Sequence, residues 1–213
     1  DVIPDHQAGA LTGPNLAREI MAGFAAASVI AIDDERVARQ VQRVFHSGVF
    51  RVYTNGDVIG CELGGALKNV IAIATGMGDG LGVGDNTRSA VITRGLAEIT
   101  RLGVAMGGVA STFAGLAGMG DLIATCVSPQ SRNRYVGEQL GKGRTIDEIV
   151  AEMKMVAEGI KTSKVVVEVA ASYGVEMPIA EEVYGVVHEG HPATDAYRGL
   201  LRRHARSELH GMS

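Results

Sequence analysis

The chain has 213 residues, of which 46% are hydrophobic and 21% charged, a composition typical of a globular protein and unlike that of a disordered or fibrous one. Lys and Arg total 20 against 24 Asp and Glu, and a net charge of -4 without a long basic run argues against a nucleic-acid binder. No run of about 18 uninterrupted apolar residues indicates a membrane span, and the start, "DVIPDHQAGA", lacks a signal-peptide pattern, so we expect a cytoplasmic protein.

The first fifty-odd residues alternate between two kinds of pattern. Runs with strand character, "ALTG", "ASVIAID" and "FRVYTNG", are separated by the helical patterns "PNLAREIMAG" and "DERVARQVQRVFHS". This alternation predicts an α/β sheet. Pro14 suits a first helical position, and Asp33 or Asp34 suits the N-cap of a second helix that ends near His46.

After Asp57 the strand signals stop, and the rest of the chain has apolar residues at helical spacing. We therefore divide the chain into residues 1–56, an α/β part, and residues 57–213, an all-helical domain. The predicted helices of this domain cover residues 57–75, 86–106, 111–118, 131–141, 145–153, 157–173, 178–189 and 192–205.

The first two of these helices are separated by "GMGDGLGVGDN", with glycine at every second position from 76 to 84. A nucleotide-binding loop is one interpretation, but the segment follows a helix rather than a strand and does not match G-x-G-x-x-G. We favour the alternative, a flexible connection.

Lys68 interrupts the apolar or small run "GGALKNVIAIATG". Its helical neighbours Gly64, Gly65, Ile71 and Ala72 include no acid, so no local ion pair explains the charge. The side chain would lie over the two glycines, beside a notch. Either the lysine extends along apolar surface to water, or burial favours its neutral amine, which can exchange protons in catalysis.

Two further segments carry candidate site residues. In "GMGDLIATC", Asp121 either caps the next helix or accepts a bond from a substrate hydroxyl or an ammonium group, with Thr125 on the same face. In "SPQSRNRY", Ser131 is the predicted N-cap of a helix whose first turn contains Arg132 and Asn133. A cation in the first turn is unfavourable, because the N-terminal end of the helix dipole is positive. Either the arginine is simply solvated on a surface helix, or a bound phosphate offsets the positive charge.

The two cysteines, Cys61 and Cys126, lie far apart and lack the spacing of a metal site or a disulfide scaffold. We predict packed free thiols, a reducing compartment and no metal site.

Taken together, "LTGPNLAREI", "LGGALKNVIAIATGMGDGLGVGDNTRSAVITRGLAEI", "GLAGMGDLIATC", "SRNR" and "VAEGIKT" resemble the bacterial NAD(P)-dependent glycerol-3-phosphate dehydrogenases. The resemblance extends over the whole chain. It implies the C-terminal part of a Rossmann-type domain followed by an all-α substrate domain of the 6-phosphogluconate dehydrogenase-like kind. It also implies NAD or NADP as cofactor and dihydroxyacetone phosphate or sn-glycerol 3-phosphate as the small phosphorylated substrate, for phospholipid synthesis.

The resemblance also assigns roles to residues. It makes Lys68 the proton donor and acceptor at the substrate C2 oxygen, supported by Asn69 and Thr125. The other residues that it places at the substrate are Gly13, Asn15, Asp121, Ser131, Arg132 and Asn133. Those that it places at the cofactor are Ala17, Arg132, Val156 and Glu158.

The sequence departs from the family at its beginning. The glycine-rich strand-turn-helix that holds the pyrophosphate and a second substrate lysine are missing, and no G-x-G-x-x-G occurs. We therefore expect a truncated or incompletely recorded chain that binds the dinucleotide poorly. The alternatives are a related 6-phosphogluconate or 3-hydroxyacid dehydrogenase, or a non-catalytic helical dimerisation fragment. A homodimer is compatible with each, and no nucleic-acid or membrane partner is expected.

Overall fold

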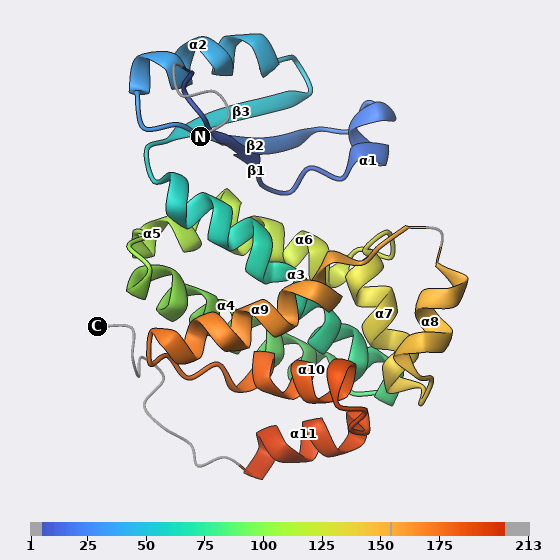
Figure 1. Cartoon of the computed structure of the whole chain (residues 1–213). Coiled ribbons are helices and arrows are strands. Elements are labelled where there is room, and N and C mark those ends of the chain that lie inside the picture. Colours follow the sequence, from blue (N-terminus) through green and yellow to red (C-terminus); the bar gives the residue numbers. More distant parts are fainter. Residues whose placement is uncertain (1–5, 154, 203–213) are drawn as a thin grey trace.

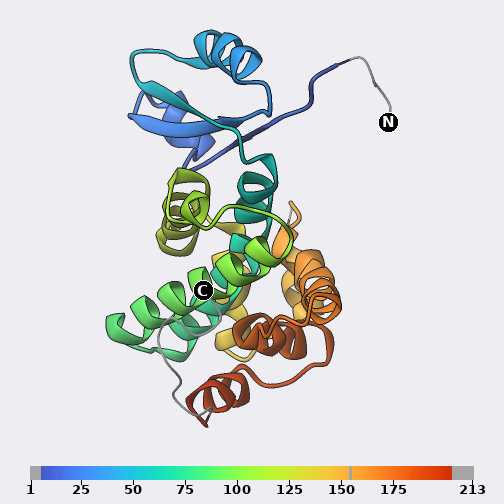
Figure 2. The same cartoon turned by 90° about the vertical axis from the view of Figure 1, so that its left-hand side faces the viewer.

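The computed structural model describes residues 6–153 and 155–202. A small sheet with two helices lies at one end of the molecule, and the remaining helices form a bundle at the other (Figures 1 and 2). The elements of the first part are β1 (Ala10–Thr12), α1 (Ala17–Met21), β2 (Ala26–Ala31), α2 (Glu35–Phe45) and β3 (Phe50–Asn55).

The three strands are ordered β1-β2-β3, with β1 antiparallel and β3 parallel to β2. Ile30 lies opposite Leu11 on one side and Thr54 on the other. Since side chains alternate along a strand, β2 has two apolar faces. Ile30 packs with Ala38 of α2, and Val29 packs with Cys61 of the helical part. The contact between Val29 and Cys61 packs the sheet against the helical bundle.

The predicted alternation of strands and helices in an α/β sheet is confirmed. Asp34 is also confirmed as the N-cap of α2, since its carboxylate accepts the backbone N–H of Arg36 at 2.8 Å. The prediction for Pro14 is wrong. The helix begins only at Ala17, and Pro14 lies with Gly13 in a bend after β1.

The helical part begins with α3 (Val58–Leu81), which runs through the middle of the bundle (Figure 1). By length and composition α3 could cross a membrane, but 61% of its most apolar window is buried inside the protein. The other elements are α4 (Asp85–Ala105), α5 (Ala110–Phe113), the π-helical turn η1 (Leu116–Gly120), α6 (Asp121–Val127), α7 (Arg132–Gly141), α8 (Ile146–Glu152), α9 (Glu158–Ser172), α10 (Pro178–His188) and α11 (Ala193–Arg202).

The glycine-rich segment is helical, so the prediction of a flexible connection is wrong for residues 76–81. A Cβ atom on Gly76 would lie 2.0 Å from the carbonyl oxygen of Arg134, and one on Gly80 would lie 2.2 Å from that of Glu138. On the facing helix, a Cβ on Gly137 would lie 2.0 Å from the carbonyl oxygen of Ile73. The glycines therefore let the backbones of α3 and α7 touch, and this close packing compensates for their low helix propensity.

Most other predicted helices are confirmed within two residues at their ends. The predicted helix 111–118 is wrong, because this stretch divides into α5 and η1. The end of the last predicted helix, beyond residue 202, lies outside the described residues.

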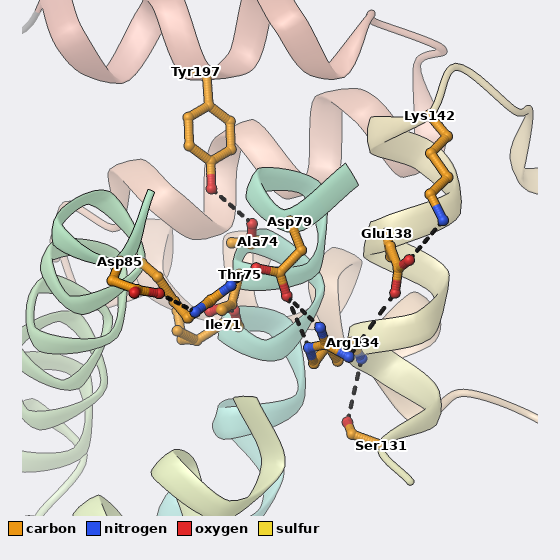
Figure 3. Close-up of polar contacts among 11 residues, drawn as sticks. Ile71, Ala74, Thr75, Asp79, Asp85, Ser131, Arg134, Glu138, Lys142 and Tyr197 are labelled. Atoms are coloured by element: carbon orange, nitrogen blue, oxygen red, sulfur yellow. Dashed lines mark hydrogen bonds and ion pairs between the residues drawn. The ribbon is translucent and has the colours of Figure 1, made fainter. Parts of the chain in front are cut away.

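One buried and one partly buried contact hold the C-terminal helices in place. Glu98 of α4 accepts the backbone N–H groups of Ile179 at 2.8 Å and Ala180 at 3.3 Å, so its carboxylate caps α10. Tyr197 of α11 donates its hydroxyl to the carbonyl oxygen of Ala74 at 3.0 Å (Figure 3). A Cβ on Gly78 would lie 2.2 Å from that hydroxyl, so α11 packs where α3 has no side chain.

Candidate active site

Lys68 pairs with Asp121 across the boundary between α3 and α6. Their side chains are 17% and 6% exposed, so this is a largely buried ion pair between residues 53 positions apart. The lysine therefore does not extend to water along apolar surface. Asp121 also does not cap α6, because α6 has no side-chain cap bond.

The Asp121 carboxylate has two more donors, which belong to different parts of the fold. The hydroxyl of Thr125 donates to the backbone carbonyl oxygen of Asp121 at 2.7 Å and also lies 3.4 Å from Oδ1, and the backbone N–H of Gly13 donates to the carboxylate from the bend after β1. Burial raises the pKa of Asp121 above its ordinary value. Lys68 and the two further donors lower the pKa and so oppose that shift. The carboxylate thus holds the lysine ammonium at the junction of the sheet and the bundle.

Gly13 is suited to this position by its conformation. Its φ of 128° is one that residues with a side chain rarely adopt, and a Cβ there would lie 3.1 Å from Cα of Ser28. After it, Pro14 lies beside Gly120, since a Cβ on Gly120 would be 3.5 Å from Cδ of Pro14. Asn15 is half-buried, and Ala17 is exposed at the first position of α1.

The expected notch beside Lys68 is not an empty space. A Cβ on Gly64 would lie 2.6 Å from the carbonyl oxygen of Ala117, and one on Gly65 would lie 2.9 Å from Oγ1 of Thr12. The two glycines instead allow η1 and β1 to approach α3 closely. They bring the turn before Asp121 within reach of the lysine.

Asn69 begins a chain of hydrogen bonds that links α3, α7 and α9. Its Oδ1 accepts Nδ2 of Asn133 at 2.9 Å, and Oδ1 of Asn133 accepts the backbone N–H of Gly159 at 2.9 Å. Nδ2 of Asn69 also lies 3.5 Å from Oε2 of Glu158. Because both Asn side chains are buried and bonded within the protein, their first role is to hold α7 and α9 beside the lysine.

Ser131 caps α7 as predicted, since its hydroxyl accepts the backbone N–H of Arg134 at 3.2 Å. Arg132 follows it and is exposed. The first turn of α7 contains no acid, so the exposed guanidinium group of Arg132 adds to the positive end of the helix dipole. This arrangement can bind an anion such as phosphate.

The structure brings Gly13, Lys68, Asp121 and Thr125 into one group, and joins it through Asn69 to Asn133 and Glu158. Val156 is 62% exposed, next to the first residues of α9. A surface hollow lined by Tyr53, Asn55 and Thr112 contains none of these residues. We place the site at Lys68 because its buried ion pair with Asp121 lies where the bend after β1 meets α3 and α6.

Sequence reasoning missed Asp79, a buried carboxylate of α3 that pairs with Arg88 of α4 and Arg134 of α7. Figure 3 shows Asp79 and Arg134 pointing toward each other. A signal was present, because Asp79 is an acid within an apolar and glycine-rich run. The same glycine-rich run is also typical of a connection between helices, which hides this signal.

The chain is similar in sequence and fold to known proteins. A sequence model of a family described as "NAD-dependent glycerol-3-phosphate dehydrogenase C-terminus" matches residues 57–198. "Glycerol-3-phosphate dehydrogenase (NAD(P)+) 2" of Sphingopyxis alaskensis is 64% identical over 210 residues, which are 99% of this chain and 63% of the relative. The Mycobacterium avium protein named "Glycerol-3-phosphate dehydrogenase (NAD(P)+)" is 55% identical over 99% of this chain and 62% of its own length.

A solved structure is also similar. The crystal structure of glycerol-3-phosphate dehydrogenase from Coxiella burnetii superposes with a TM-score of 0.89 at 40% identity, over 92% of this chain and 60% of that one. The chain thus spans less than two thirds of the length of these relatives.

Proposed function

This chain belongs to the NAD-dependent glycerol-3-phosphate dehydrogenase family, and from that premise we propose that it carries the substrate half of such an enzyme. The reaction is reversible hydride transfer between NAD(P)H and dihydroxyacetone phosphate, which gives sn-glycerol 3-phosphate for phospholipid synthesis. The buried pair of Lys68 and Asp121, connected through Asn69 to the N-terminus of α7, is the observation that carries this proposal. It combines a proton-transfer group with an anion site, as a phosphorylated ketone requires.

In this proposal Lys68 transfers the proton at the substrate C2 oxygen. Its ammonium group can donate to an oxygen that becomes an alkoxide as hydride arrives at C2. Asp121 keeps the amine in place, and Thr125 and Gly13 hold the carboxylate. Asn15, in the bend after Gly13, is the other substrate contact that we assign to this side of the site.

The phosphate group would bind at the start of α7. Arg132 and the free backbone N–H groups of the first turn supply positive charge and donors. Ser131 is occupied as the N-cap but has a hydroxyl proton left to donate. Asn133 acts by fixing this turn next to Asn69.

NAD or NADP would supply the hydride when bound. We assign Ala17, Arg132, Val156 and Glu158 to its contacts, and their exposure together with the approach of Glu158 to Asn69 supports this assignment. We also propose that residues 1–56 are the C-terminal part of a Rossmann-type domain and residues 57–213 a substrate domain of the 6-phosphogluconate dehydrogenase-like kind.

The test has two readouts. Oxidation of NADH or NADPH on adding dihydroxyacetone phosphate measures turnover, and calorimetric titration with glycerol 3-phosphate measures binding by the chain itself. We expect Lys68→Ala to abolish turnover and Arg132→Gln to weaken binding of glycerol 3-phosphate at least tenfold. Lys142→Ala is a matched control, because this lysine is half exposed and pairs with Glu138 at the far end of α7. A wild-type chain that neither turns over dihydroxyacetone phosphate nor binds glycerol 3-phosphate would refute the proposal.

A further inference from the structure

Asp79 is one of the most deeply buried charges among the described residues, and it lies between two arginines. Its side chain is 6% exposed. Oδ1 accepts Nε of Arg88 at 2.9 Å, and Oδ2 accepts Nε of Arg134 at 2.8 Å, each with a second contact from Nη2 at 2.7 Å. One carboxylate therefore connects α3 to both α4 and α7.

Arg134 belongs to the same first turn of α7 as Arg132. Two cations there oppose the helix dipole and repel each other. Asp79 neutralises Arg134 and turns it toward α3 (Figure 3), whereas Arg132 is exposed. The result is a helix N-terminus with one guanidinium group held inside and the other directed to solvent.

The contact between α3 and α7 needs such an anchor. Glycines on both helices let the backbones touch, and apolar side chains such as Val136 and Leu140 pack around this contact. Apolar packing is not directional, so polar contacts add the directional bonds that fix the position of one helix along the other. Two polar contacts cross this boundary, Asn69 with Asn133 and Asp79 with Arg134. Asn69 and Asp79 lie ten residues apart, or about 15 Å along α3, so together they fix position and angle.

We propose that Asp79 is a positioning residue for the phosphate site. Through Arg134 it fixes the first turn of α7 relative to the segment of α3 that carries Lys68, and it leaves Arg132 as the arginine of that turn that meets the phosphate. This inference rests on the proposed function, since it concerns the same site. Asp79 touches neither substrate nor cofactor and acts only through the placement of α7.

The test compares Asp79→Asn with two controls in the same chain. Asp85→Asn also removes a carboxylate partner of Arg88, but that carboxylate is 91% exposed and does not contact Arg134. Arg88→Gln removes the other arginine and keeps the bond between Asp79 and Arg134. The readouts are the dissociation constant for glycerol 3-phosphate and for inorganic phosphate, and amide hydrogen exchange at residues 134–136, whose N–H groups are the first in α7 to be hydrogen-bonded, with residues 183–187 of α10 as the reference.

In Asp79→Asn we expect exchange at residues 134–136 to accelerate at least tenfold relative to α10, and the dissociation constant for both ligands to rise at least tenfold. Asp85→Asn should change each by less than twofold. Arg88→Gln should not accelerate exchange in the first turn of α7 more than in α10, even if it lowers overall stability. Since the measure is a ratio between two helices of one variant, general destabilisation does not imitate the expected result.

Two other outcomes separate the inference from its premise. If Asp79→Asn bound both ligands as tightly as wild type, the role of Asp79 would be wrong while the proposed function stood. The same would follow if the exchange ratio between α7 and α10 were equal in Asp79→Asn and Arg88→Gln. If the wild-type chain bound neither ligand, the proposed function would be rejected, and with it the role of Asp79 in phosphate binding.

Discussion

Nδ2 of Asn133 donates a hydrogen bond at 2.9 Å to Oδ1 of Asn69, the residue that follows Lys68. Oδ1 of Asn133 accepts the backbone N–H of Gly159. A single buried amide thereby joins three helices at the site.

Asn133→Ala should lower stability because it leaves Oδ1 of Asn69 and the N–H of Gly159 without their partner. Each unpaired buried group costs about 1 to 3 kcal/mol. The free energy of unfolding from urea titration, followed by circular dichroism, measures the loss. Asn86→Ala is the control, because Asn86 is exposed in the first turn of α4 and its removal should change stability by no more than about 0.5 kcal/mol. Similar losses in the two variants would mean that the amide chain does not stabilise the fold.

Gly137→Ala should disrupt the contact between α3 and α7. The new Cβ would lie 2.0 Å from the carbonyl oxygen of Ile73, and backbone cannot move aside as a flexible side chain can. We expect a loss of about 3 kcal/mol or more, measured as a fall in the urea midpoint. Gly48→Ala adds the same methyl group where nothing lies within 4 Å, so it should be close to neutral. Equal midpoints for the two variants would contradict the close packing.

Glu98 should make stability depend on pH. Burial raises its pKa from 4.5 to about 7, against the opposing effect of the N–H groups of Ile179 and Ala180; Arg101 also lowers it and Glu181 raises it. Between these values the folded chain holds the proton more tightly than the unfolded chain does. The contribution of Glu98 to stability is therefore greatest below pH 4.5 and is lost as pH rises toward 7.

The measurement is the unfolding free energy of wild type and Glu98→Gln from pH 4 to 8. The difference, wild type minus variant, should fall as pH rises through this window. The exposed Glu62→Gln is the control for the substitution itself, and at pH 7 it should change the unfolding free energy by no more than about 0.5 kcal/mol. A constant difference for Glu98→Gln would show that Glu98 titrates alike in both states.

Lys68→Met should destabilise the chain more at neutral than at acid pH. Lys68 lowers the pKa of Asp121, which burial holds above its ordinary value of 3.8. Without the ammonium group the folded carboxyl group keeps its proton to higher pH, so the cost of the substitution grows as pH rises above that value. At pH 7 we expect a loss of roughly 3 kcal/mol, since one partner of a buried pair is left alone.

The control for this prediction is Lys142→Met. Its pair with Glu138 is half exposed, so its loss should cost less than about 1 kcal/mol. A cost of Lys68→Met that does not vary from pH 4 to 8 would exclude Asp121 as the group that responds.

Local sequence signals predicted what depends on neighbouring residues. Asp34 and Ser131 cap α2 and α7 as expected, because a cap needs only an oxygen and the N–H two or three residues later. The sequence pattern singled out Lys68 and Asp121 as candidates, the resemblance to a family assigned their roles, and the structure showed that they are paired. Local pattern could not show this, since 53 residues separate them.

The failures have the same origin. Glycine is a poor helix former, so residues 76–81 were interpreted as a connection, whereas contact with α7 makes glycine the residue that fits there. Asp79 was overlooked with them, because its arginines are on other helices. Pro14 fits a first helical position by itself. Its neighbour Gly13, however, is held in a bend by the hydrogen bond from the Gly13 N–H to the Asp121 carboxylate.

The contact of Tyr197 with Gly78 has a consequence for how these sequences can change over time. Any side chain at position 78 would displace the hydroxyl group that anchors α11, and a smaller residue at position 197 would leave an unfilled space above α3. Neither substitution is tolerable alone, although both together could be. In an alignment of relatives, glycine at 78 and tyrosine at 197 should therefore be kept or replaced as a pair.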